Sequence, residues 1–312
     1  MPAVLLQVLA TALTLLLGVY VTALLDRFIG AFVAGRSLEL PRLVAAPARS
    51  AAQLLLQSSA RTERPDRALW ALAPALLGGL AACALAAVPL TVVASQHDVA
   101  SGIVLFGAVM ALVMVAVYLN GWAPNAVLPL IGGYRFVASA LSYEMPLALV
   151  LIAAALPAES LSIADIARSQ QATWNVLRQP LGLPLYLIAG LGLAFWGPLN
   201  FADAHDLAGG TAAELSGVQL LLWRVARLSV LFAIAAMGAA AFLAGPYGPW
   251  LPGPVWMSLK ILALLGLLLA IGHGVARVRL ERFVVIAWTV LIPLALIDVF
   301  ASGLLAIWQQ SS

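Results

Sequence analysis

Eight hydrophobic runs divide this sequence, and a helix of about 20 residues matches the hydrocarbon core of a bilayer. Hydrophobic residues make up 63% of the chain and charged residues only 9%, which excludes a soluble globular domain of this size. We therefore expect one all-α polytopic membrane domain over residues 1–312. The predicted spans lie near residues 3–25, 69–93, 101–119, 136–157, 182–198, 218–243, 254–274 and 283–308.

The arginines are unevenly distributed between the two sides of the predicted domain. Thirteen fall on one side, in or beside the odd-numbered loops, whereas the other side has only Arg168 and Arg178. Because basic loops remain in the cytoplasm, this asymmetry predicts a multi-pass protein of the cell inner (plasma) membrane with both termini outside. The net charge of +3 follows from the same bias, so nothing indicates a nucleic-acid partner. The first run lacks a preceding basic residue, which favours a retained helix over a cleaved signal peptide.

A single cysteine limits the redox chemistry that this chain can carry. Cys83 alone can neither hold an iron–sulfur cluster nor form an internal disulfide, and we interpret it as a small buried hydrophobic residue. The sequence shows no metal-ligand spacing, because one histidine stands among scattered carboxylates in residues 203–214. We expect the chain itself to bind no cofactor, so any redox centre must lie on a partner subunit.

The first long loop contains a segment, residues 40–58, in which apolar and polar residues alternate at helical spacing. An amphipathic helix at the bilayer interface is favoured, and a loosely packed cytoplasmic linker is the alternative. The two predicted faces are Leu43, Val44, Ala51, Leu54 and Leu55 against Arg42, Arg49 and Gln53.

Residues 121–149 carry ionisable side chains into the start of a span. If the chain enters the bilayer near Phe136, Glu144 lies roughly 12 Å deep, where an isolated carboxylate is costly. Proton handling is therefore our leading hypothesis for Glu144, with Arg135 as a nearby charge. The alternative is a carboxylate that only hydrogen-bonds a neighbouring helix. Tyr143 either donates to Glu144 or is an interfacial aromatic residue.

The loop of residues 197–217 is acidic on the side where the other loops are basic. It contains Asp203, His205, Asp206 and Glu214 but no lysine or arginine. Asp203 and Asp206 are three residues apart and would share a helical face, and like charges held close raise one another's pKa. We therefore expect a coupling segment that binds protons, with an ordinary solvated loop as the alternative.

Three further ionisable residues lie in or beside predicted spans. Lys260, seven residues into the seventh span, can extend its amine toward the interface. Asp298 lies ten residues from the outer end of the last span and is either functional or satisfied by a nearby serine or threonine. His273 is interpreted as an interfacial residue.

Several of these segments resemble the H subunit of respiratory complex I, the membrane subunit that forms the floor of the quinone chamber. The first segment matches that family without a gap, the acidic loop matches it with one residue deleted, and the last loop has its Arg-x-Arg-x-acid spacing. The resemblance covers nearly the whole chain. The matching elements are GWAPN (121–125), Gly132–Gly133, Arg135, LSYEMPL (141–147), residues 198–217, Lys260 and RVRLERF (277–283).

The resemblance implies a non-redox subunit of a proton-translocating NADH:quinone oxidoreductase of the respiratory chain, with no activity alone. Its partners would be a soluble arm with iron–sulfur clusters and the quinone site, and a row of antiporter-like membrane subunits. In that family, quinone enters between the first helix, the amphipathic helix and the sixth helix. The implied proton-path residues are Glu144, Asp203, His205, Asp206 and Glu214; the supporting residues are Arg135, Tyr143, Lys260, Arg277, Arg279 and Glu281; the quinone-chamber candidates are Asp26, Arg27, Arg36 and Arg42.

This sequence also departs from the family around the quinone chamber. The first loop reads RSLELPRLVAAP (36–47) in place of a Gly-Pro-Asn-Arg type motif, and AFWG (194–197) lacks the arginine that normally precedes the acidic loop. His205 replaces another carboxylate. Either the electron acceptor has changed, or the quinone is held by other groups such as Arg36 and Arg42.

Three other functions remain open from the sequence, one of which is a purely structural membrane anchor. A membrane subunit of an energy-converting [NiFe] hydrogenase-type complex is the main alternative, although GWAPN is less typical of those subunits. A stand-alone transporter, with Glu144 and Asp298 as ion ligands, is less favoured because the two halves show no internal repeat.

Overall fold

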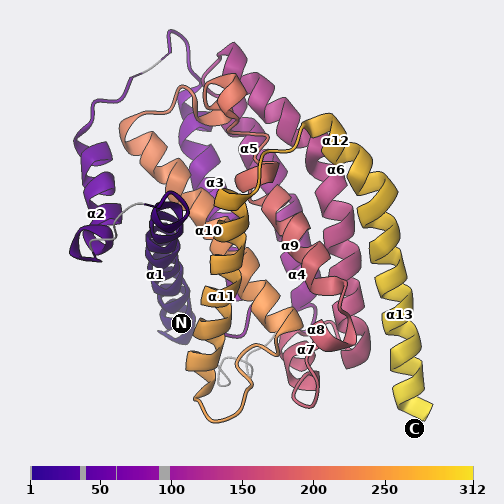
Figure 1. The fold of residues 1–312 in the computed structure, drawn as a ribbon. Helices are drawn as coiled ribbons and strands as arrows, with labels where there is room; N and C mark the ends of the chain where they lie inside the picture. Colours follow the sequence, from indigo (N-terminus) through magenta and orange to yellow (C-terminus); the bar gives the residue numbers. More distant parts are fainter. Residues whose placement is uncertain (1, 36–39, 61, 91–98, 312) are drawn as a thin grey trace.

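Helices packed side by side form a bundle, and they are the only regular secondary structure in the described part of the chain (Figure 1). The computed structural model describes residues 2–35, 40–60, 62–90 and 99–311, with the backbone alone at 2–7, 40, 42 and 309–311. The prediction of an all-α polytopic membrane protein is confirmed. Within these described residues, seven stretches are long and apolar enough to cross a membrane: Val8–Val33, Arg67–Ala86, Gly102–Trp122, Val127–Ala158, Gly217–Phe242, Gly253–Gly274 and Leu280–Trp308.

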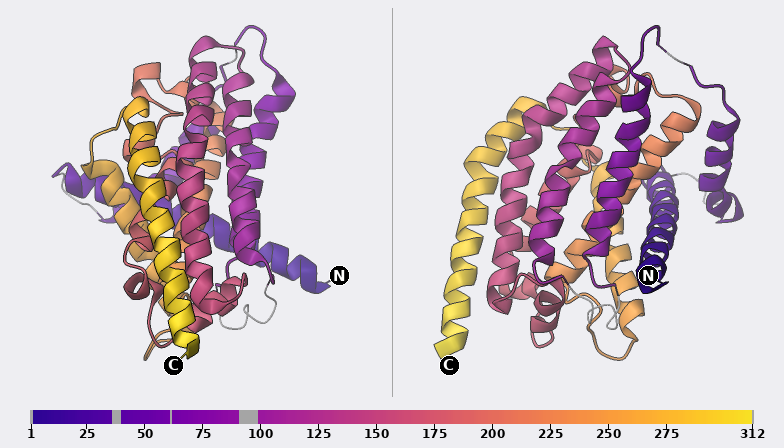
Figure 2. Two further views of the ribbon diagram at one scale, coloured as in Figure 1. Left: turned by 90° about the vertical axis from the view of Figure 1, so that its right-hand side faces the viewer. Right: turned by 180° about the vertical axis from the view of Figure 1, so that it is seen from behind.

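The helices follow the predicted spans, although their ends are shifted by several residues. In Figure 1, α2 stands at one edge of the bundle and α13 at the other, and Figure 2 shows α1 crossing the other helices obliquely. The α-helices are α1 (Pro2–Val33), α2 (Leu40–Leu56), α3 (Arg67–Ala86), α4 (Gly102–Ala111), α5 (Val113–Trp122), α6 (Val127–Ala155), α7 (Ile163–Ser169), α8 (Asn175–Arg178), α9 (Gly182–Leu193), α10 (Gly217–Phe242), α11 (Gly253–Gly274), α12 (Leu280–Ile286) and α13 (Ile292–Ser311).

The fifth predicted span, residues 182–198, is shorter than expected. Its helix α9 has only 12 residues, or about 18 Å, which is less than the bilayer core. Helical geometry ends because Phe195 and Gly197 adopt positive φ angles of 40° and 55°, and Pro198 follows directly. Among the described residues, seven of the eight predicted spans form helices long enough to cross a membrane, and the fifth forms the short apolar helix α9.

Helix α10 lies at the centre of the bundle and contacts α1, α2, α3, α9 and α11. Small side chains allow this close approach, because without a hydrophobic driving force helices in lipid associate through tight packing. A run of fully buried alanines lies along its second half: Ala233, Ala235, Ala236, Ala239, Ala240 and Ala241. Tyr186 of α9 donates a 2.7 Å hydrogen bond to the Ile234 carbonyl of α10.

The predicted amphipathic segment forms α2, which packs against α1 and α10. Tyr20 of α1 donates a 2.7 Å hydrogen bond to the carbonyl of Val44 in α2, and the Arg27 side chain donates to Ser50. The alternative of a loosely packed linker is therefore wrong. The position of α2 at the bilayer interface stays a prediction.

The outward faces of the peripheral helices carry exposed hydrophobic side chains, as contact with lipid requires. On α13 these include Leu296, Ile297 and Phe300. Cys83 of α3 is also exposed, so the expectation that it is buried is wrong. Hydropathy alone does not distinguish the lipid-facing side of a helix from its buried side.

The acidic loop lies tightly against the first half of α6, and two glycines permit this contact. The Ala202 carbonyl accepts a hydrogen bond from the Thr211 amide, 3.1 Å away. A Cβ on Gly132 of α6 would lie 2.6 Å from that carbonyl oxygen, and one on Gly210, where φ is +55°, would lie 1.8 Å from it. Any larger residue at these positions would displace the loop.

Candidate functional site

A cavity of about 410 Å³ lies between α1, α2 and α10. Most of its wall is apolar and includes Leu16 and Val19 of α1, Leu54 of α2 and Leu228 of α10. A few charged side chains from α1 and α10 also line it. A mostly apolar cavity with a few polar groups is typical of sites for small organic molecules.

The quinone-chamber candidates are only partly placed at this cavity. Asp26 and Arg27 line it, whereas Arg36 and the side chain of Arg42 lie outside the described residues. Asp26 accepts from His273 Nε2 at 2.8 Å, which ties α1 to α11. His273 therefore has a defined partner on α1, and its position at the membrane interface stays a prediction.

Two arginines of α10, Arg224 and Arg227, also line the cavity, although in the sequence they indicated only the topology. Arg227 is the more buried of the two, and its side chain is 17% exposed. It lies 4.7 Å from the ring centroids of both Phe195 and Trp196 and donates to the Phe195 carbonyl. Two arginines inside one predicted span, residues 218–243, were the signal that could have identified it.

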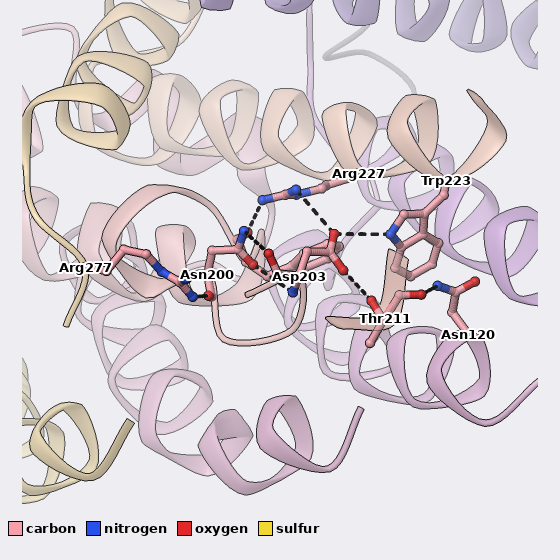
Figure 3. A network of polar contacts seen from close by, with 8 residues as sticks. Asn120, Asn200, Asp203, Thr211, Trp223, Arg227 and Arg277 are labelled. Atoms are coloured by element: carbon pink, nitrogen blue, oxygen red, sulfur yellow. Dashed lines mark hydrogen bonds and ion pairs between the residues drawn. The ribbon is translucent and has the colours of Figure 1, made fainter. Parts of the chain in front are cut away.

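Asp203 is the carboxylate that this arginine faces, at 3.3 Å between Arg227 Nη1 and Asp203 Oδ2 (Figure 3). The Asp203 side chain is only 7% exposed. Trp223 Nε1 donates to the same oxygen at 3.3 Å, and the Thr211 hydroxyl donates to the other. Three side chains therefore satisfy one buried carboxylate, as a buried charge requires.

The network continues from Asp203 in two directions (Figure 3). The Thr211 carbonyl accepts from Asn120 of α5 at 2.9 Å. On the other side, Asn200 bonds to the Asp203 backbone through both its amide nitrogen and its amide oxygen. Arg277 then donates to the Asn200 carbonyl. The acidic loop thus joins α5, α10 and the segment before α12.

Asp206 lines a second cavity, of about 500 Å³, and its side chain is 57% exposed. Arg135 of α6 donates to Asp206 at 2.5 Å, and Arg277 lies 3.7 Å from it. The hydrogen bond from Arg135 lowers the pKa of Asp206 below its usual value. Arg279 and Glu281 also line this cavity.

The acidic loop therefore differs from the predicted arrangement. Asp203 and Asp206 do not share a helical face, because the loop consists of turns and a 3-10 turn over His205–Leu207. Asp203 pairs with Arg227, whereas Asp206 pairs with Arg135 and Arg277, and all three arginines belong to other elements. His205 is exposed and Glu214 half-buried, and neither belongs to the networks around Asp203 and Asp206.

Glu144 lies near the middle of α6, which begins at Val127, and its depth in the bilayer stays a prediction. Its Oε1 atom is buried and has no hydrogen-bond partner in the described residues. Arg135 binds Asp206 instead. Tyr143 is fully buried beside Phe136, at 5.6 Å between ring centroids, and its hydroxyl has no described partner. The expectation that Tyr143 donates to Glu144 is therefore wrong, and its position at the membrane interface stays a prediction.

Lys260 and Asp298 lie apart from these two cavities. The Lys260 amine donates to the carbonyls of Gly245 and Tyr247 at 2.8 and 2.7 Å, in the connection between α10 and α11. Asp298 is buried, but its Oδ2 and the hydroxyl of Ser302, one turn later, make no described hydrogen bond. The predicted satisfaction of Asp298 by a nearby serine is not observed.

The family model described as NADH dehydrogenase matches residues 5–303. The chain belongs to this family. The H subunit of NADH-quinone oxidoreductase from Geobacillus kaustophilus is 32% identical to it over 261 residues, which cover 82% of this chain and 78% of the relative. In Rhodopseudomonas palustris, the H subunit that is numbered 2 is 32% identical over 250 residues, covering 79% and 78%.

Membership of the NADH dehydrogenase family confirms the resemblance to the H subunit and does not favour the hydrogenase-type alternative. Together with the seven apolar helices found in the described residues, it identifies an integral membrane protein of the bacterial inner membrane. No group of three or more His, Cys, Asp or Glu residues with the arrangement of a metal site occurs in the part of the chain that the structure describes.

Proposed function

We propose that this chain is the subunit of a complex I-type NADH:quinone oxidoreductase that forms the floor of the quinone chamber. The cavity between α1, α2 and α10 carries this proposal. It combines an apolar wall, suited to an isoprenoid tail, with the charged groups of Asp26, Arg27, Arg224 and Arg227, suited to the polar quinone ring. The name of the relatives supports the same substrate class.

The chain would act only within its complex. Electrons would come from iron–sulfur clusters of a soluble partner arm, since one cysteine cannot hold a cluster. Antiporter-like membrane subunits would bind elsewhere on the bundle. The ends rich in arginine would face the cytoplasm, where the soluble arm docks, and both termini would lie outside.

The cavity can be tested by filling it. Ala51 of α2 lines the cavity, whereas the next residue, Ala52, is exposed and does not. In membranes with the assembled complex, Ala51→Trp should abolish or strongly slow quinone reduction by NADH, while Ala52→Trp should not. Electron transfer from NADH to a water-soluble artificial acceptor should stay unchanged in both. Normal quinone reduction by Ala51→Trp would contradict the proposed site.

We further propose that carboxylates conduct protons between this cavity and the membrane axis, with Glu144 as the member inside the bundle. A buried carboxylate oxygen without a partner among the described residues supports this role. His205, Glu214, Lys260, Arg279 and Glu281 remain candidates without an observed role in such a path.

Glu144→Gln keeps the side-chain shape but cannot ionise. We expect the complex to assemble and reduce quinone, with proton translocation lost or strongly lowered. Glu159→Gln, at an exposed acid after α6, is the control. Proton uptake and release in vesicles, measured beside NADH oxidation, decide between the two roles, because a carboxylate that only packs would leave translocation at the parental rate.

A further inference from the structure

Arg227 belongs both to the cavity wall and to the Asp203 network. Trp196 lies between these two regions as well, because it lines the cavity and faces the Arg227 guanidinium at 4.7 Å. A ligand that contacts Arg227 in the cavity would therefore contact the counter-ion of Asp203.

The hydrogen bonds of Arg227 leave part of its donor capacity unused. A guanidinium has five N–H donors, of which Nη1 reaches Asp203 and Nη2 the Phe195 carbonyl. Nε is buried and has no partner in the described residues. The contact with Asp203 is 3.3 Å long, whereas charge-assisted hydrogen bonds are typically about 2.7–2.9 Å.

The surroundings hold the guanidinium in place without relying on Asp203 alone. The rings of Phe195 and Trp196 both lie 4.7 Å from it, and such cation–π contacts are favourable in a desolvated site. Asp203, in turn, keeps hydrogen bonds from Thr211 and Trp223. Each partner of the ion pair can therefore loosen its contact with the other and remain positioned.

We propose that Arg227 binds the quinone headgroup and shares its guanidinium between that headgroup and Asp203. A ring carbonyl oxygen of the quinone would accept an N–H of Arg227, and Asp203 would lose part of its counter-charge. Binding of quinone in the cavity would therefore change the electrostatic environment of Asp203, which belongs to the network in Figure 3. This inference rests on the proposed function of the cavity.

A double-mutant cycle distinguishes headgroup binding from a purely structural ion pair. Arg227→Gln, Asp203→Asn and the double variant are compared in membranes with the assembled complex, using a short-chain quinone. We expect Arg227→Gln to raise the KM for quinone about tenfold, in line with loss of a charged hydrogen bond. Asp203→Asn should leave KM within about twofold but lower the number of protons translocated per quinone. The double variant should keep the high KM.

The structural explanation predicts the opposite result for the double variant. If Arg227 only neutralises Asp203, removing both charges should restore the parental KM, because a buried pair can be replaced as a whole at little cost. That restoration would overturn the inference. If Arg227→Gln does not assemble, the double variant and Arg227→Lys decide, since lysine keeps the charge but not the planar fork. A parental KM in both of them overturns the inference.

Two controls separate this inference from the proposed function. Arg49→Gln, at an exposed arginine of α2, should change neither KM nor the proton ratio. If Ala51→Trp blocks quinone reduction but the Arg227 variants behave as the parent, only this inference fails. If Ala51→Trp leaves quinone reduction unchanged, the cavity is not the quinone site and both fail.

Discussion

Asp203 and Asp206 are three residues apart in one loop, but they occupy opposite environments. The Asp203 side chain is 7% exposed and faces Arg227 inside the bundle, whereas that of Asp206 is 57% exposed and faces Arg135 at an open cavity. The shorter contact belongs to the exposed pair, at 2.5 Å against 3.3 Å. The contact distance alone would therefore rank the two pairs in the wrong order of their contributions to stability.

How deeply each pair is buried decides how much it contributes to the stability of the fold. Water and salt screen the Asp206 pair, so its contribution to stability is small. Asp203 and Arg227 have both lost water, and each depends on the other and on neighbouring hydrogen bonds. The same loop thus holds Asp203 inside the bundle, paired with an arginine that lines the first cavity, and Asp206 in an exposed position at the second cavity.

The largest expected effect is the removal of one partner from the buried pair. Asp203→Leu, unlike Asp203→Asn, removes the acceptor of the Thr211 and Trp223 hydrogen bonds together with the counter-ion of Arg227, and breaking a buried pair in this way typically costs about 3–5 kcal/mol. We expect the subunit to fail to assemble or to show a strongly lowered thermal stability in detergent, measured by native gel and thermal unfolding. A melting temperature equal to that of the parent would show that the Asp203–Arg227 pair contributes little to stability.

Gly210→Ala tests whether the shape of the loop separates the two carboxylates. A Cβ at this positive-φ position would lie 1.8 Å from the Ala202 carbonyl oxygen, so the loop must shift, at about 1–3 kcal/mol for the strained backbone alone. Thermal unfolding should show a clear loss. Gly79→Ala is the control, because its Cβ meets nothing within 4 Å, and it should be neutral or slightly stabilising.

Asp206→Asn should have a small effect, about 0–1 kcal/mol of stability, because the pair with Arg135 is solvent-exposed. The difference from the parent should shrink further in high salt. Thermal unfolding at low and high ionic strength is the measurement. A loss as large as that of Asp203→Leu would abolish the contrast between the two pairs.

The contribution of the Asp206 pair to stability should hardly depend on pH in the neutral range, which makes this the smallest of the expected effects. The pKa of Asp206 is lowered in the folded protein, so its contribution is present above the ordinary aspartate pKa of about 3.9. It is lost as pH falls through the lowered folded-state pKa. The stability difference between the parent and Asp206→Asn should stay constant from about pH 5 to 8 and disappear in strong acid. A change near neutral pH would indicate a raised pKa instead.

Sequence alone determined the all-α membrane architecture, the amphipathic α2 helix and the family. Run length, helical periodicity and local motifs are properties of neighbouring residues, so they can be read without knowledge of the fold. The hydropathy pattern did not show the end of α9, because a change to positive φ at Phe195 leaves hydropathy unchanged.

Only the tertiary structure decided which charges meet. Arg135 pairs with a residue 71 positions away, and Asp203 with one 24 positions away on another helix. Such contacts depend on how α6, α10 and the acidic loop pack, which the order of residues in that loop does not show. The loop contains no basic residue, yet packing places an arginine at each of its aspartates. The pairing matters most for Asp203, because a buried charge is costly without a partner.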